Sequence, residues 1–128
     1  MGYAKLSEAA FEQSFEFMQI ADADNLNNRN IGKLYNKQAE SYLLLQEYDL
    51  ALKTFQKALN TVLPSVDASD INQNPLIKIL YPENTIVEAL YGKTRVLAKK
   101  YTLSAQVDDV ELALASYDLA LSAEHKLR

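Results

Sequence analysis

A short pattern of small and bulky side chains occurs three times along this chain, and it constrains the fold more than any other feature. Residues 6–15, 50–59 and 112–121 each carry a small residue, a ring four positions later and a second small residue three positions after the ring. This spacing places the side chains on one face of an α-helix, where the small residues let a neighbouring helix approach closely and the ring fills the space beside it. One such helix cannot bury this face alone, so the pattern predicts a stack of helices.

The hydrophobic spacing of the whole chain predicts an all-α fold of about five helices. The chain contains three glycines and three prolines, and such low counts favour long helices over a turn-rich β fold. All three prolines lie in residues 64–82, so we expect an inserted linker there that packs on the helices. Asp49 is expected to cap the third helix, and Asp108 or Asp109 the fifth. The expected helices span residues 3–22, about 28–45, 49–63, about 83–101 and about 109–126.

The apolar positions of these helices are expected to form the core. Tyrosines at pattern positions are included, because no basic stripe lies beside them that would favour stacking on nucleic-acid bases. The tyrosines assigned to the core are Tyr35, Tyr42, Tyr48 and Tyr117. In the helix over residues 49–63, the residues expected to point inward are Leu50, Ala51, Phe55, Ala58, Leu59 and Val62.

Composition argues against several classes of function. The 128 residues amount to one domain, and a net charge of −4 with no basic tract argues against nucleic-acid binding. The chain has no cysteine and a single histidine, His125, which excludes thiolate and multi-histidine metal sites. We therefore expect no metal, no cofactor and no enzymatic activity. No apolar run is long enough to span a bilayer and residues 1–13 lack a signal-peptide core, so we expect no membrane association and a cytoplasmic location.

Residues 35–58 resemble a tetratricopeptide repeat. That family combines a ring, a small residue and a second ring in its first helix with alanine, phenylalanine and alanine in its second helix. The positions that carry the resemblance are Tyr35, Ala39, Tyr42, Tyr48, Ala51, Phe55 and Ala58. The resemblance implies antiparallel helix–turn–helix repeats stacked as a short right-handed superhelix.

We expect a single domain over residues 1–128, and the same resemblance divides this domain into repeat segments. The later copy departs from the family pattern, because Thr94 stands where Ala39 stands in the first hairpin. The resemblance implies a second helix of a partial repeat at 3–22, a repeat hairpin at 26–63, the inserted linker at 64–82 and a divergent hairpin at 83–127.

The second half of the chain, from about residue 58 to 128, is similar to the repeat region upstream of bacterial CHAT domains. Those domains are caspase- and separase-like peptidase modules at the C-terminal end of long chains. The similar segments read ALNTVLPSVD, LYPENTIVEALYGKTRVLAKKY and DDVELALASYDLALSAEHKLR. This resemblance implies a fragment of a longer bacterial protein whose partner is a CHAT domain in the same parent chain. No peptidase activity carries over, because the chain has no cysteine to act as a nucleophile.

In tetratricopeptide arrays, side chains of the first helices line a concave groove that binds peptides. Lys33 and Lys37 lie one helical turn apart and can grip a carboxylate together. The alternative is that both lysines are solvated surface. The groove positions that the resemblance assigns are Lys33, Asn36, Lys37, Glu40, Leu43 and Leu44 in the first hairpin, and Glu88, Tyr91 and Arg95 in the second.

Three functions are weighed from the sequence. The first is a protein-interaction module that binds a peptide or a partner domain in the helical groove. The second is a regulatory repeat fragment that couples partner recognition to a CHAT peptidase. The third, a small-ligand carrier or enzyme, is disfavoured because no His, Cys or Gly-rich constellation converges. The rings and apolar residues of 3–20 further predict a homodimer through that segment.

The pattern makes Phe55 a central packing residue. Phe55→Ala should be among the most damaging single substitutions, since truncation of a buried ring costs about 3–5 kcal/mol. Ala58→Leu should also destabilise the chain, because it overpacks a close helix contact. Thermal and urea denaturation measure both effects. An unchanged melting temperature for Ala58→Leu would show that Ala58 does not lie in a helix interface.

Overall fold

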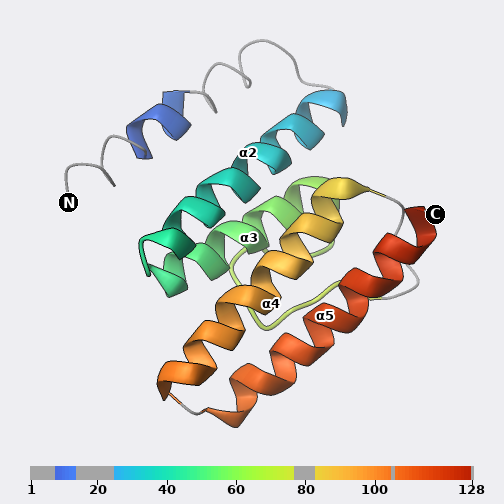
Figure 1. Ribbon diagram of the computed structural model, residues 1–128. Coiled ribbons are helices and arrows are strands. Elements are labelled where there is room, and N and C mark those ends of the chain that lie inside the picture. Colours follow the sequence, from blue (N-terminus) through green and yellow to red (C-terminus); the bar gives the residue numbers. More distant parts are fainter. Residues whose placement is uncertain (1–7, 14–24, 77–82, 105, 128) are drawn as a thin grey trace.

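The computed structural model describes residues 8–13, 25–76, 83–104 and 106–127, and this part of the chain contains helices and no strand (Figure 1). The expected all-α fold is confirmed. A short helical segment covers residues 8–13. The four long helices are α2 (Asn25–Leu44), α3 (Tyr48–Val62), α4 (Asn84–Ser104) and α5 (Val107–Leu127).

The helix bounds lie close to the expected ones, with two differences at the helix ends. The turn between α4 and α5 is shorter than the loop expected at 102–109, because α4 continues to Ser104 and α5 begins at Val107. The expectation that Asp49 caps α3 is wrong. Glu47 holds the cap position without a side-chain cap bond, and Asp49 lies in the first turn. There its carboxylate still interacts favourably with the positive end of the helix dipole.

The long helices form two antiparallel hairpins that pack against each other (Figure 1). One hairpin is α2 with α3, and the other is α4 with α5. Between the hairpins, α4 contacts both α3 and α2. The first helices of the two hairpins therefore lie next to each other, which is the arrangement that the expected groove requires. The right-handed superhelix stays a prediction.

Small residues bring the helices of each hairpin together. A Cβ atom added at Gly32 of α2 would lie 3.5 Å from the Ala58 carbonyl oxygen of α3. In the second hairpin, the Thr94 hydroxyl of α4 donates to the Ala113 carbonyl oxygen of α5 at 3.4 Å. Ala58 is the second small residue of its copy of the pattern and Ala113 the first of its copy, so small residues of the pattern lie at the helix interface in both hairpins.

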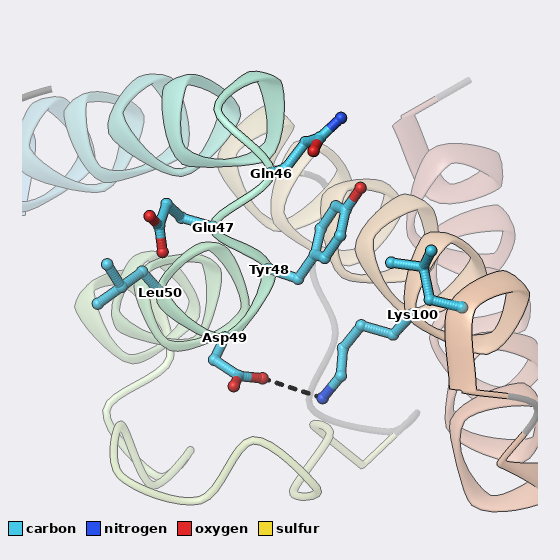
Figure 2. Close-up of a pocket in the computed structure, with 7 residues that line it drawn as sticks. Gln46, Glu47, Tyr48, Asp49, Leu50 and Lys100 are labelled. Atoms are coloured by element: carbon cyan, nitrogen blue, oxygen red, sulfur yellow. Dashed lines mark hydrogen bonds and ion pairs between the residues drawn. The ribbon is translucent and has the colours of Figure 1, made fainter. Parts of the chain in front are cut away.

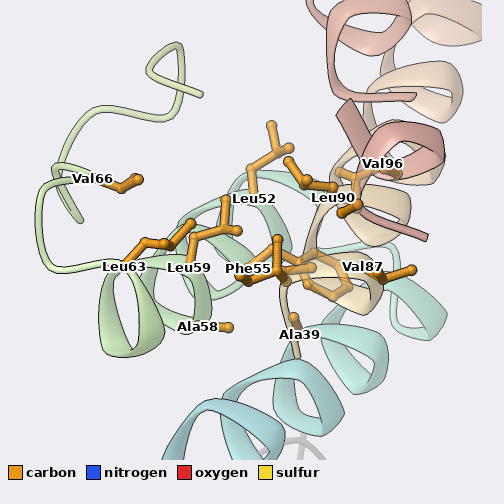
Figure 3. Close-up of a cluster of buried hydrophobic side chains, with 14 of the residues drawn as sticks. Ala39, Leu52, Phe55, Ala58, Leu59, Leu63, Val66, Val87, Leu90 and Val96 are labelled. Carbon is orange, nitrogen blue, oxygen red and sulfur yellow. The ribbon is translucent and has the colours of Figure 1, made fainter. Parts of the chain in front are cut away.

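Phe55 lies at the centre of the core and is fully buried (Figure 3). Its ring occupies the space in front of Gly92 on α4, where an added Cβ would lie 2.2–2.7 Å from three ring carbons. The expected inward positions of α3 are buried with one exception. The placement of Leu50 was wrong, because 42% of it is exposed. The confirmed positions are Ala51, Phe55, Ala58, Leu59 and Val62.

The tyrosines expected in the core differ in how far they are buried. Tyr35, Tyr42 and Tyr48 are partly buried and pack against the core. Tyr117 was also expected in the core, but 43% of it is exposed. Its ring contacts the Tyr91 ring of α4, with centroids 5.9 Å apart, but no described helix follows α5 in the chain to cover the rest of it.

The described part of the linker, residues 64–76, contains turns and no helix, as expected. Val66 is buried in the core and anchors this segment by its side chain. Residues 77–82 lie outside the described residues, as does most of the expected 3–22 helix. The homodimer surface assigned to 3–20 can therefore be placed only in part. Within the described helices, none combines the length and apolarity that a membrane span requires.

Gly92→Ala should destabilise the chain, although alanine is normally the better helix residue. The new methyl group would overlap the Phe55 ring, and overpacking of this kind costs about 1–3 kcal/mol. Gly32→Ala is the control, because its Cβ would meet only one atom within 3 Å, the Thr85 methyl carbon at 2.8 Å, instead of three ring carbons. Urea denaturation should show the larger loss for Gly92→Ala. Equal losses at both glycines would contradict a rigid ring contact.

Candidate functional site

The groove positions on α2 fall into one exposed stripe. Lys33, Lys37, Glu40 and Leu44 follow one another at steps of three or four residues, and all four side chains are exposed. On α4, Glu88 and Arg95 are exposed as well.

An ion pair joins the exposed faces of α2 and α4. The Arg95 guanidinium Nη2 lies 3.3 Å from Glu40 Oε1, and each side chain is about half exposed. The pair shows that the groove positions of the two helices adjoin at this point. Exposed positions of α2 and α4 therefore lie side by side at this point.

Three of the expected groove residues instead serve packing. Asn36 is buried, and its Nδ2 donates to the Thr85 carbonyl oxygen at 3.1 Å, which ties α2 to α4. Tyr91 is half-buried, and its hydroxyl donates to Glu124 Oε2 of α5. Leu43 is half-buried and packs against the core. Position in the repeat alone did not distinguish these residues from the exposed ones.

A hollow of about 190 Å³ lies at the lysine end of this face. It is lined by Asn30, Lys33, Leu34 and Lys37. The ion pairs among the described residues include neither Lys33 nor Lys37. Two ammonium groups beside an apolar side chain suit a carboxylate next to an aliphatic group.

A larger cleft of about 310 Å³ opens at the turn between α2 and α3 (Figure 2). Gln46 makes this turn with a φ of 62°, in the left-handed region. Lys100 Nζ of α4 lies 3.0 Å from Asp49 Oδ1 of α3, so an ion pair closes one side of the cleft. Leu50 and Leu103 supply exposed apolar surface. This lining offers apolar contact area, the Asp49–Lys100 ion pair and the carboxylate of Glu47.

The sequence interpretation missed a buried cation, Lys93 of α4. Its side chain is fully buried. The ammonium group donates to Gln56 Oε1 of α3 at 2.7 Å and to Asn74 Oδ1 of the linker at 2.8 Å. The signal in the sequence was its position, since Lys93 shares an apolar helix face with Leu90 and Leu97.

The residues around Lys93 fasten the linker to three helices. Gln56 Nε2 donates to the Asp67 carbonyl oxygen at 3.1 Å and to the Gln73 carbonyl oxygen at 2.7 Å. Asn74 Nδ2 donates to Ser116 Oγ of α5 at 3.1 Å. The network thus links α3, α4, α5 and residues 67–74 through buried or partly buried hydrogen bonds.

Burial lowers the pKa of Lys93 to about 7, and the carboxylate of Asp70 opposes this shift. An amine with such a pKa is a good nucleophile when substrate can reach it. Here the side chain is enclosed and its donors are taken by carbonyl oxygens. The arrangement therefore fits a structural anchor rather than a catalytic base.

In comparisons with known proteins, no family model, no curated protein and no solved structure matches the chain. Among the residues that the structure describes, no group of three or more His, Asp or Glu side chains is placed to hold a metal ion.

Lys93 should make stability depend on pH. Its pKa is about 7 in the folded chain and about 10.4 when unfolded, so between these values the unfolded chain binds more protons. The unfolding free energy should therefore rise from pH 7 to pH 9, by at most about 1.4 kcal/mol per pH unit. Urea denaturation at pH 7, 8 and 9 measures this slope. The range ends below pH 10, above which the raised pKa of Tyr42, about 12, acts in the opposite sense.

Lys93→Met should flatten the slope, whatever it does to stability at a single pH. Lys53→Met, at an exposed position of α3, is the control and should keep the slope. A rise of equal size in Lys93→Met and the parent chain would contradict the assignment.

Proposed function

We propose that this chain is a protein-interaction module that binds peptide segments across the adjoining exposed faces of α2 and α4. The observation that carries the proposal is the Glu40–Arg95 ion pair, because it joins first-helix positions of two hairpins into one surface. A surface that spans two hairpins offers an extended ligand contacts from both helices.

The side chains along α2 indicate the chemistry of the ligand. Lys33 and Lys37 attract a carboxylate at one end of the stripe, and Leu44 offers an apolar contact at the other. Lys33 and Leu44 are eleven residues apart, which is about 16 Å along a helix. About five residues of an extended peptide cover this length. A short acidic peptide with an apolar side chain about five residues away fits both ends.

Binding is favoured over catalysis by the state of the polar groups. The exposed charges of Glu40 and Arg95 pair with each other, and Lys93 is enclosed in the core. A surface of this kind offers charge and contact area to a ligand without an activated nucleophile.

Selection from a random peptide library on the immobilised chain should enrich acidic peptides. Lys33→Ala with Lys37→Ala should weaken the selected peptides by about tenfold or more, since hydrogen bonds to charged groups contribute about 1.5–3 kcal/mol each. Lys53→Ala with Lys57→Ala is the matched control, because these lysines are also one turn apart and exposed, on α3. Titration calorimetry measures the affinities. Equal weakening by both pairs, or none by either, would contradict the proposed surface.

A further inference from the structure

The outward face of α5 carries an exposed copy of a surface that is buried on α3. The repeated pattern aligns the two helices, and adding 62 to an α3 residue number gives its α5 equivalent. Three bulky residues of α3, namely Leu52, Phe55 and Leu59, are fully buried. Their equivalents on α5 are exposed: Leu114 by 60%, Tyr117 by 43% and Leu121 by 42%.

An acidic side chain accompanies the bulky stripe on both helices. On α3 it is Asp49, which pairs with Lys100 of α4 at 3.0 Å. The equivalent on α5 is Glu111, which is exposed. The ion pairs among the described residues do not include Glu111. On α5 both the apolar stripe and the acid are therefore present and exposed, although one side of the Tyr117 ring contacts the Tyr91 ring of α4, with centroids 5.9 Å apart.

The helix that covers α3 shows what such a surface accepts. Gly92 of α4 lies against the Phe55 ring, and Lys100, eight residues later, reaches Asp49. Because Asp49 precedes Phe55 while Lys100 follows Gly92, the two helices run antiparallel. A small residue admits the ring and a later basic residue meets the acid.

We propose that the outward face of α5 binds an amphipathic helix of a partner protein. The helix runs antiparallel to α5, presents glycine or alanine to Tyr117 and carries lysine or arginine about two turns later, opposite Glu111. The apolar stripe extends to Val107, and from there to Leu121 it measures about 21 Å, which a partner helix of about 15 residues covers.

A second copy of this chain fits the surface less well than a basic helix. Glu111 and Asp118 are both exposed acids on α5, so two copies of α5 packed together would bring like charges near each other. The Gly92 face of α4 in a second copy is already covered by its own α3. Charge complementarity therefore selects a partner helix with basic side chains beside its apolar stripe.

A peptide with the sequence of residues 84–104 is a direct probe, because it carries both features in the required spacing. Fluorescence anisotropy should show binding of the labelled peptide to the full chain. Leu114→Glu should weaken this binding at least tenfold, while Leu76→Glu, at an exposed linker position, should leave it unchanged. Binding that is insensitive to Leu114→Glu would mean that the peptide has displaced α4 instead, and it would overturn the proposal, as would no binding at millimolar peptide.

A charge exchange tests the predicted contact itself. Glu111→Lys should weaken the probe peptide about fivefold or more, and Lys100→Glu in the peptide should restore binding to that variant. Replacing Gly92 of the peptide by leucine should abolish binding to the parent chain. Failure of the exchange to restore affinity would overturn the assigned orientation. The double variant Lys33→Ala, Lys37→Ala should bind the probe peptide like the parent chain. Binding of the probe to α5 is therefore tested independently of the proposed α2–α4 surface.

Discussion

The contact between the Phe55 ring and Gly92 sets how the two hairpins meet. Only a residue without a side chain leaves room for the ring at this point, so α4 lies close against α3. The residues that follow, Gln56 on α3 and Lys93 on α4, are then brought within hydrogen-bond distance. The same register places Lys100 beside Asp49 two turns away. One steric fit thus determines a buried polar contact and a surface ion pair.

The buried ammonium group of Lys93 explains why the linker follows a defined path. Burying a charge in a core is costly unless hydrogen bonds replace its lost hydration. The linker supplies the side-chain oxygen of Asn74, and its backbone carbonyl oxygens are held by Gln56. Loss of this path would remove the Asn74 acceptor from the buried amine and both carbonyl acceptors from Gln56 Nε2. The irregular segment is therefore specified by polar groups more than by its few buried apolar side chains.

The sequence predicted what depends on local spacing. Helix positions and the small residues of the hairpin interfaces follow from periodicity, which each helix carries within itself. Tyr117 was misplaced because its burial depends on whether another helix follows α5, and the repeated pattern is the same in either case. Asn36 was assigned to the groove because repeat position does not show that its amide meets the Thr85 carbonyl 49 residues away. The partners of Lys93 were missed for the same reason, since they come from separate segments.

The two proposed surfaces differ in the free-energy terms that govern the binding of a partner. On the α2–α4 face, the Glu40–Arg95 pair is half exposed, and such pairs contribute about 0–1 kcal/mol to stability. A ligand can therefore take over these charges at little cost, which favours weak and readily exchanged binding. On α5, the Leu114 side chain is exposed to solvent, and burying it against apolar atoms of a partner lowers the free energy of the complex. Because that gain grows with the apolar area buried, the α5 surface is suited to a longer and more persistent association than the α2–α4 face.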